Sequence, residues 1–579
     1  MKRNFLYVFV AFVLLQSCEN KLDTQPDGAV MTDKQVKEVI EGDATKLASE
    51  VNGLFSIMKA FPAALGNSGN QDDYGFPSIV AKMEHNGQDC VGDVTGYNWY
   101  SGEQDYTTRN YTYRAPRLIW QFFYKQVYIA NSIINKVDPA TTDPVAKAYL
   151  GQALAMRAFD YFNLIQLFQF TYKGHEDALG VPIVKNDTPL DVINNNPRAT
   201  VGDVYDFILS DLDGAITLLE GATRTNKSFI DQSIAYGLRA RVNLVMQNWA
   251  DAKSDATNAL SVGGENPMSI ADVSEPTFDD ATAPGIMWGI VISSEDDCVK
   301  SGICNFTSMF TSLCFGYGGY TTIVGTWKKI NILLYNQIPA TDVRKGWWLD
   351  ASYRSPLVNN YPMKKELYEY WTGRAYNATT QENLFWGYMG MKKYTNVKFA
   401  PNDKDYMSNE NSSDFPLMRA EEMVLIQAEA EAMLGNTGSA KTMLENFVKT
   451  YRNPDYVTTA ATSEQLQDEI WLQRRIEFWG EGISWFDIMR LKKPITRKAD
   501  GVTGFSALAI FNIPSETSYM LWPIPIAEIQ ANNGISDELN NQMGTLPSSD
   551  PVKKIINDGF KIHPARTFFP GMKEYNNME

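Results

Sequence analysis

The chain has 579 residues, of which 44% are hydrophobic and 12% aromatic, and its formal net charge is −16 at pH 7. This length is ample for one large core or for two closely packed lobes. A surface this acidic disfavours nucleic acid and anionic membrane faces as partners, although it does not identify a ligand.

The N-terminus has the pattern of a lipoprotein signal peptide. Lys2 and Arg3 precede an unbroken apolar run over residues 5–15, which is too short to span a bilayer. The sequence LQSC that ends at Cys18 resembles the bacterial lipobox. This resemblance implies cleavage after residue 17 and acylation of Cys18, with an ordinary secretory signal as the alternative. We therefore expect residues 1–17 to be a signal peptide and Cys18 to be a lipid anchor. No other segment has the pattern of a transmembrane helix.

Helical periodicity dominates residues 119–260. Apolar residues recur there every three or four positions, in five stripes that each predict one face of a helix. The third helix is predicted to begin at Thr200, with Asp203 placed as in a capping box. The fifth helix is predicted to follow Asn248. Representative stripe residues are Trp120, Phe123, Val127, Leu150, Leu154, Phe162, Val204, Ile208, Leu212, Leu238, Val242, Trp249 and Ala256.

A second helical stretch is predicted near the C-terminus. It comprises a helix over residues 417–434, a break at Gly435-Asn436 and Gly438, a stripe over 440–451, and a helix over 466–479 that is entered through Ser463. Helix pairs with short turns and with alanine at close approaches resemble tetratricopeptide-like units, although the strict consensus is missing. The sequence therefore predicts a mainly α fold, with degenerate helical repeats as its scaffold.

The segment between the two helical stretches, residues 278–416, has a different character. It holds six of the 13 tryptophans, and residues 301–327 contain five glycines and no charged residue. This composition favours loops and short strands. Residues 67–113 are similarly irregular and aromatic.

Four cysteines remain once Cys18 is lipidated. They form no CxxC pair, and the three histidines are far apart in sequence, which argues against a zinc site of common spacing. Because Gly302 allows the chain to fold back, we hypothesise that Cys298 and Cys304 form a small disulfide loop. The other two cysteines are Cys90 and Cys314.

Six segments resemble the SusD/RagB family and occur in that family's order. Two positions depart from the family's pattern, namely Gln473, where glutamate is usual, and Ser484, where arginine is frequent. The six segments are residues 22–26 (LDTQP), 157–162 (RAFDYF), 180–182 (GVP), 419–430, 474–490, and 523–525 (PIP) with Glu528 and Asn532.

The resemblance implies a helical solenoid-like body that carries an irregular, loop-rich ligand-binding face. It implies an N-terminal helical region over residues 18–277 and a C-terminal region over residues 278–579. The C-terminal region is expected to be loop-rich over 278–416 and helical over 417–579, and the two regions are expected to pack as one unit. It also implies surface exposure at the outer membrane, and delivery of an oligomeric nutrient to a SusC-like TonB-dependent transporter. Glycans are the expected ligands. The alternatives are a peptide-binding member of the family and a helical-repeat lipoprotein that holds other proteins in assemblies.

The charged residues of these motifs are interpreted as structural ion pairs, since charges at helix contacts are usually paired. They are Arg157, Arg419, Glu429, Arg475, Glu477, Glu481, Asp487 and Arg490.

Nothing in the sequence identifies a reaction. It lacks a G-x-S-x-G elbow, an H-E-x-x-H motif and a P-loop, and no glycosidase-type pair stands out among its 68 acidic residues. We therefore expect no enzymatic activity, no cofactor and no metal site of recognised spacing. Calcium binding is left open, without support from a motif, because the acidic stretch 403–414 lacks the spacing of a recognised calcium loop. A glycan-cleaving enzyme is a third alternative, which product release from oligosaccharides would reveal.

The candidate ligand-binding residues are loop aromatics and their polar neighbours. A tryptophan or tyrosine ring packs against the apolar face of a sugar, while amide and carboxylate groups bind its hydroxyls. Trp99 is the preferred stacking platform because it lies outside every predicted helical stripe, and the alternative is that it is a core residue. The full set comprises Tyr97, Asn98, Trp99 and Tyr100, then Asp72 and Asp73, and finally Tyr317, Tyr320 and Trp327.

Overall fold

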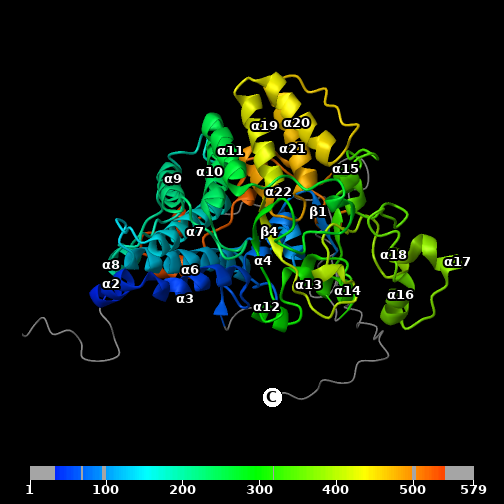
Figure 1. Cartoon of the computed structure of the whole chain (residues 1–579), viewed down its shortest axis with the longest axis horizontal. Coiled ribbons are helices and arrows are strands. Elements are labelled where there is room, and N and C mark those ends of the chain that lie inside the picture. Colours follow the sequence, from blue (N-terminus) through cyan, green and yellow to red (C-terminus); the bar gives the residue numbers. More distant parts are fainter. Residues whose placement is uncertain (1–32, 67–69, 94–98, 317–318, 499–503, 542–579) are drawn as a thin grey trace, which may run out of the picture.

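The computed structural model describes residues 33–66, 70–93, 99–316, 319–498 and 504–541. In this part of the chain the fold is mainly helical, as predicted (Figure 1). The long helices of the first half pack in chain order, so that α6 contacts α7, α7 contacts α9, and α9 contacts α10, which packs on α11. Their bounds are α6 Arg114–Lys136, α7 Pro144–Phe168, α9 Val201–Leu218, α10 Gln232–Met246 and α11 Trp249–Gly263.

Side-chain caps begin several of these helices where the sequence predicts it. The Thr200 hydroxyl accepts the amide hydrogen of Asp203 at 3.1 Å and donates to the Asp203 carboxylate at 2.7 Å. Asp143 and Asp231 cap α7 and α10 in the same way. Each cap satisfies a backbone amide that has no partner inside its helix.

The helical layer continues directly from α11 to α19, although more than 150 residues separate them in sequence. Helix α19 packs on α11 on one side and on α20 and α21 on the other (Figure 1). The two helical stretches therefore form one scaffold, which confirms the prediction of repeated helical units. The bounds are α19 Ala420–Met433, α20 Thr437–Tyr451 and α21 Ser463–Glu477.

Two details of the C-terminal prediction are wrong. Leu417 lies in a strand, not in the predicted helix, because residues 415–419 pair with residues 286–290 and α19 begins only at Ala420. Gly438 lies inside α20 and does not break the chain, since Gly435, with φ of +84°, already makes the turn before it.

Three small antiparallel sheets, each of two strands, join distant segments of the described chain. Strand β1 (Cys90–Gly92) pairs with β3 (Lys328–Ile330), and β5 (Ile495–Thr496) pairs with β6 (Asn512–Ile513). Strand β2 (Ile286–Ile290) pairs with β4 (Phe415–Arg419), with Ile290 opposite Phe415.

The loop-rich segment between β2 and β4 has its own hydrophobic core. Trp327, Tyr368, Phe385 and Trp386 belong to this core, separate from the main one. Helices α16, α17 and α18 stand at the edge of the molecule (Figure 1). The helices of this segment are α12 Asp297–Lys300, α13 Phe306–Phe310, α14 Tyr320–Val324, α15 Ile332–Tyr335, α16 Lys364–Thr372, α17 Ala378–Gln381 and α18 Phe385–Tyr388.

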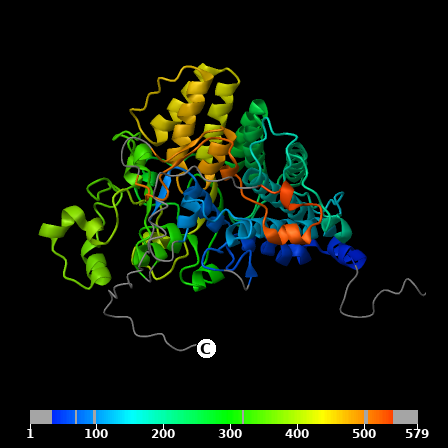
Figure 2. The same ribbon diagram turned by 180° about the vertical axis from the view of Figure 1, so that it is seen from behind.

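The remaining segments wrap around the scaffold (Figure 2). Backbone bonds hold the C-terminal part, since the Trp522 amide donates to Leu167 and the Ile526 amide to Tyr111, both at 2.9 Å. Their helices are α2 Asp33–Gly42, α3 Ala48–Ser56, α4 Phe76–Asn86, α5 Ser101–Gln104, α8 Leu190–Ile193, α22 Ile483–Arg490 and α23 Ile526–Ala531.

The predicted disulfide between Cys298 and Cys304 is wrong, because both cysteines are buried free thiols. The chain does turn back at Gly302, whose φ is +81°. Hydrogen bonds close this turn: the Ser301 hydroxyl donates to the Cys298 carbonyl at 2.6 Å and accepts from the Cys304 amide at 3.0 Å. Cys90 and Cys314 are also buried and free.

Within the residues that the structure describes, no helix is long and apolar enough to cross a membrane. The proposed anchor Cys18 lies outside these residues.

Candidate ligand-binding site

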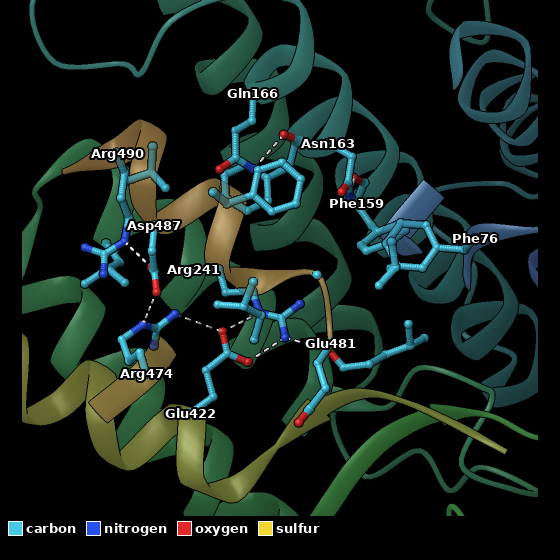
Figure 3. Close-up of a pocket in the computed structure, with 18 residues that line it drawn as sticks. Phe76, Phe159, Asn163, Gln166, Arg241, Glu422, Arg474, Glu481, Asp487 and Arg490 are labelled. Carbon is cyan, nitrogen blue, oxygen red and sulfur yellow. Dashed lines mark hydrogen bonds and ion pairs between the residues drawn. The ribbon is translucent and has the colours of Figure 1, made fainter. Parts of the chain in front are cut away.

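A pocket lies where the N-terminal helices meet the C-terminal ones (Figure 3). This junction pocket is small, with a cavity volume of about 70 Å³. Its apolar wall includes Phe76 from α4 and Phe159 from α7, and α10, α19, α21 and α22 supply charged groups. Its charged lining residues are Arg241, Glu422, Arg474, Glu481, Asp487 and Arg490.

The charges of the junction pocket neutralise one another. Arg241 binds Glu422 through two hydrogen bonds of 2.9 and 2.5 Å, and Asp487 accepts from Arg474 and Arg490 at 2.7 Å each (Figure 3). Burial alone would raise the pKa of Asp487, but the two guanidinium groups hold it below its usual range. An acid that stays ionised and bound on both sides is a structural group, not a proton donor.

A buried ion cluster adjoins this pocket and shares Glu481 with its lining. Glu477 accepts from Arg419 at 2.9 Å, from Arg452 at 2.8 and 2.7 Å, and from Arg344 at 3.3 Å. Burial opposes the charge of Glu477, yet the three arginines hold its pKa well below the usual range. We define the buried ion cluster as Arg344, Lys398, Arg419, Arg452, Asp342, Glu421, Glu477 and Glu481.

The predicted structural role of the charged motif residues is confirmed, because each of the eight forms an ion pair. Arg157 binds Asp211 at 2.7 Å, and Arg490 binds Glu429 at 2.6 and 2.8 Å. Arg475 binds Asp89 at 2.9 and 2.5 Å. Ser484, one of the two departures from the family's pattern, donates to the same Asp89 at 3.1 Å.

Several predicted ligand-binding residues are buried packing groups. Tyr100 is 2% exposed, stacks on His85 and shares a hydrogen bond with the Tyr74 hydroxyl. Tyr320 is 3% exposed and Trp327 1% exposed. These three rings offer no free face to a sugar in this structure. The reason is that Tyr100 and Tyr320 pack into the main hydrophobic core, and Trp327 packs into the separate core of the loop-rich segment.

The two predicted aspartates also hold the protein together. Asp73 accepts the amide hydrogens of Ala64 and Leu65 at 2.8 and 2.9 Å, which closes a turn. Asp72 is 4% exposed and binds Lys82 at 2.7 Å as well as Arg114. Tyr97, Asn98 and Tyr317 lie outside the described residues.

Among the predicted candidates that the structure describes, Trp99 is the one that is partly exposed. Its side chain is partly buried against the main core, and its indole nitrogen donates to the Gln71 amide oxygen at 2.8 Å. Gln71 is next to Asp72 in sequence, and Asp72 binds Arg114. Tyr113, which precedes Arg114 in sequence, is 50% exposed. We call Gln71, Asp72, Trp99, Tyr113 and Arg114 the Trp99 face.

The sequence interpretation missed three members of this face, namely Gln71, Tyr113 and Arg114. Gln71 lies 28 residues from Trp99, and Arg114 lies 42 residues from Asp72. The sequence places Tyr113 only among the aromatics of the irregular segment 67–113. The structure begins α6 at Arg114, before the stripe that starts at Trp120, so no local signal marks Tyr113 as a residue at a helix entrance.

No group of three or more His, Cys, Asp or Glu side chains is placed to hold a metal ion within the described ranges.

Two family models match the chain. One, described as "SusD family", matches residues 321–542, and the other, described as "Starch-binding associating with outer membrane", matches residues 70–244. SusD-like protein P38 of Formosa agariphila is 22% identical over 520 residues, which cover 84% of this chain and 91% of the relative. A SusD-like protein of Bacteroides ovatus is 28% identical over 136 residues, 22% of each chain.

Solved structures share the fold. The crystal structure of a SusD-like carbohydrate binding protein from Bacteroides vulgatus matches with a TM-score of 0.68 at 21% identity, over 88% of this chain and 99% of that one. A SusD superfamily protein from Bacteroides thetaiotaomicron matches with a TM-score of 0.64 at 20% identity, over 86% and 99% of the two chains.

Fold and matches together define a class of non-catalytic binding proteins that associate with the outer membrane. The chain belongs to the SusD/RagB family.

Proposed function

We propose that this protein binds an oligosaccharide on the Trp99 face and delivers it to a SusC-like TonB-dependent transporter at the outer membrane. The observation that carries the proposal is the setting of Trp99, whose indole N–H is fixed by Gln71 at 2.8 Å while part of the ring stays exposed. A ring held in this way is preorganised for stacking on the apolar face of a sugar.

We expect the polar groups of the Trp99 face to bind a sugar's hydroxyl groups, although Nε and Nη2 of Arg114 are buried in this structure. Arg114 is 25% exposed in its side chain and is oriented by the nearly buried Asp72. Tyr113 adds a second exposed ring beside it. Aromatic rings with a small number of placed polar groups are the usual composition of a small-molecule site. The matched family description, starch-binding, and the carbohydrate-binding relative of known structure support a glycan as the ligand.

Trp99→Ala is expected to weaken glycan binding by about 1–3 kcal/mol, roughly 5- to 150-fold in Kd, because the stacking platform is lost. The variant should stay folded, since a partly exposed loop residue contributes less than a buried core residue. Calorimetric titration with a panel of oligosaccharides, together with the melting temperature, measures both quantities.

Two matched variants sharpen this test. Trp99→Phe keeps a ring but loses the bond to Gln71, so its affinity should lie between those of the wild type and Trp99→Ala. Trp249→Ala removes another partly buried tryptophan, at the start of α11, and should leave the affinity unchanged. Unchanged affinity in Trp99→Ala would contradict the proposed site. Binding of peptides instead of glycans would favour the peptide-binding alternative.

We expect the membrane association to depend on Cys18. Cys18→Ala should move the protein from the membrane fraction to the soluble fraction, because the proposed acyl chains are the anchor. Mass spectrometry of the mature N-terminus provides the control. An unmodified N-terminus at any other residue would refute the lipid anchor without affecting the proposal for Trp99.

A further inference from the structure

One side of helix α6 carries an uninterrupted row of exposed and half-buried residues. They recur every three or four positions, which places them on the same side of the helix. We call them the α6 stripe: Arg114, Arg117, Gln121, Lys125, Tyr128, Ser132 and Asn135. The stripe starts at Arg114, a member of the Trp99 face, and at the helical rise it reaches Tyr128 after about 21 Å and Asn135 after about 32 Å.

Helix α6 is basic, although the protein as a whole is strongly acidic. Its 23 residues include four basic residues and no acidic residue, whereas the formal net charge of the chain is −16. Acidic residues from outside the helix neutralise two of the four, since Asp72 binds Arg114 and Glu50 binds Lys136. The other two basic residues decide the charge of the stripe.

Arg117 and Lys125 have no acidic partner among the residues that the structure describes. Both are exposed. Nε of Arg117 donates to the Gln121 amide oxygen at 3.2 Å, and the Lys125 ammonium donates to the Ala63 carbonyl at 2.7 Å. These uncharged acceptors leave both positive charges in place. A strip of uncompensated positive charge on an acidic protein attracts anions locally, while the rest of the surface repels them.

A groove lies at the far end of the α6 stripe, and we call it the Tyr128 groove. It has a volume of about 430 Å³ and is lined by residues of α2, α6, α8 and the segment before α8. Tyr128 is 76% exposed there, so its ring is free to stack on a ligand. Lys185 also lines the groove and forms no ion pair with the described residues.

Asparagine side chains of the Tyr128 groove are held in fixed orientations. The Asn186 side chain donates to the Asn135 amide oxygen at 3.0 Å, and the Asn135 side chain donates to the Asn186 carbonyl. Behind them Arg157, which is 4% exposed, donates to the amide oxygens of Asn131 at 2.6 Å and Asn186 at 3.3 Å, and it is itself bound by Asp211. Groups that are oriented before binding lose little conformational entropy when a ligand arrives.

We propose that the glycan of this protein is anionic, bearing carboxylate or sulfate groups, and that it runs from the Trp99 face along the α6 stripe to the Tyr128 groove. This inference rests on the proposed function, because it takes the ligand to be an oligosaccharide that contacts Trp99. Arg117 and Lys125 bind the anionic groups through charge-assisted hydrogen bonds. An aromatic ring at each end stacks on a sugar, and the oriented amides of the groove bind hydroxyl groups.

An anionic membrane surface fits these residues less well. The α6 stripe ends in a groove with oriented amide groups, and a flat layer of lipid headgroups does not fill a groove of about 430 Å³. Vesicles of an anionic phospholipid, phosphatidylglycerol, therefore serve as the comparison in the tests.

Retention of the mature protein on immobilised heparin, a glycan with both carboxylate and sulfate groups, is the first test. A protein with a net charge near −16 is repelled by a polyanion unless a local basic site binds it. We expect retention at low salt and elution as salt screens the ion pairs. The double variant Arg117→Gln/Lys125→Gln should not be retained. Flow-through of the wild type, or full retention of this variant, would overturn the proposal.

Lys300→Gln/Lys365→Gln is the matched control. It removes the same charge from two exposed ion pairs away from α6, those with Glu295 and Glu369. This variant should be retained as the wild type is. If it lost retention as well, net charge alone would explain the result and the α6 stripe would not be a site.

Calorimetric titration with heparin oligosaccharides of increasing length is the second test. The affinity should rise with length, and Arg117→Gln/Lys125→Gln should lower it about tenfold, since each exposed ion pair contributes roughly two- to fivefold. Tyr128→Ala should remove the gain from length and leave the shortest oligomers unaffected. An affinity that is independent of length and of these variants would overturn the proposal.

The outcomes separate this inference from the proposed function. A neutral oligosaccharide that binds through Trp99 and is unaffected by Arg117→Gln/Lys125→Gln would overturn the anionic ligand and leave the proposed function intact. Heparin binding that needs Arg117 and Lys125 but not Trp99 would support the anionic ligand and contradict the Trp99 face. Binding to phosphatidylglycerol vesicles without binding to heparin would make the α6 stripe a membrane contact and overturn the inference.

Discussion

Replacing Glu477 with glutamine is expected to lower the free energy of unfolding by about 3–5 kcal/mol, the usual cost of breaking a buried ion pair. Glu477 and its partners Arg344, Arg419 and Arg452 have side chains that are at most 1% exposed. The substitution keeps the shape of Glu477 and removes its charge, so it leaves three arginines with less compensation. Chemical denaturation at pH 7 measures the change.

The pH dependence of this effect has a definite sign. Because the folded pKa of Glu477 is held well below its usual range, its stabilisation is fully present above the unfolded pKa of about 4.3 and is lost as the pH falls through the folded value. Wild type and Glu477→Gln should therefore converge in stability only in strong acid.

The control for Glu477→Gln is the same substitution in an exposed ion pair. Glu369→Gln breaks the exposed pair between Lys365 and Glu369 and should change the stability by less than about 1 kcal/mol. If Glu477→Gln were equally mild, the buried ion cluster would not be what holds Arg344 of the loop-rich segment against the C-terminal helices.

Asp160→Asn is expected to stabilise the protein at neutral pH and to remove a component of its pH dependence. Asp160 in α7 is 0% exposed, and neither of its carboxylate oxygens has a hydrogen-bond partner. Burial raises the pKa of Asp160 well above its usual range, so the folded protein holds the proton after the unfolded chain has released it.

The size of the stabilisation by Asp160→Asn follows from the linkage between proton binding and folding. Above the unfolded pKa of about 3.9, the stability should fall by about 1.4 kcal/mol per pH unit until the folded carboxyl ionises. At pH 7 the asparagine variant should therefore gain up to about 4 kcal/mol relative to the wild type. Denaturant unfolding of both proteins between pH 4 and pH 8 isolates this component, because their other titrations cancel in the difference. A constant difference across that range would show that Asp160 is ionised in the folded state.

The scaffold could be predicted from sequence because its signals are local. Apolar residues every three or four positions and the Thr200 cap lie within one or two helical turns of each other. The strand that contains Leu417 could not be predicted in this way. Its partner begins at Ile286, and the pairing that excludes a helix there is a long-range contact.

The candidate site was predicted only in part for the same reason. Trp99 could be identified because no helical stripe includes it. Tyr320 and Trp327 have the same local composition as a binding loop, yet they pack into cores that distant segments complete. Gln71 and Arg114 became recognisable only through contacts made across the fold.

The backbone pairing at Leu349 has a consequence for how the protein can vary. Leu349 donates to the Thr395 carbonyl at 2.9 Å and accepts the Tyr394 amide hydrogen at 3.0 Å, so the residues between them leave and rejoin the body of the protein at adjacent positions. The closure entropy of such an excursion grows only slowly with its length. The excursion carries α16, α17 and α18 at the edge of the molecule (Figure 1) and contributes Tyr368 and Trp386 to the separate core. It can therefore be lengthened, shortened or exchanged while the helical layer that continues from α11 to α19 stays intact.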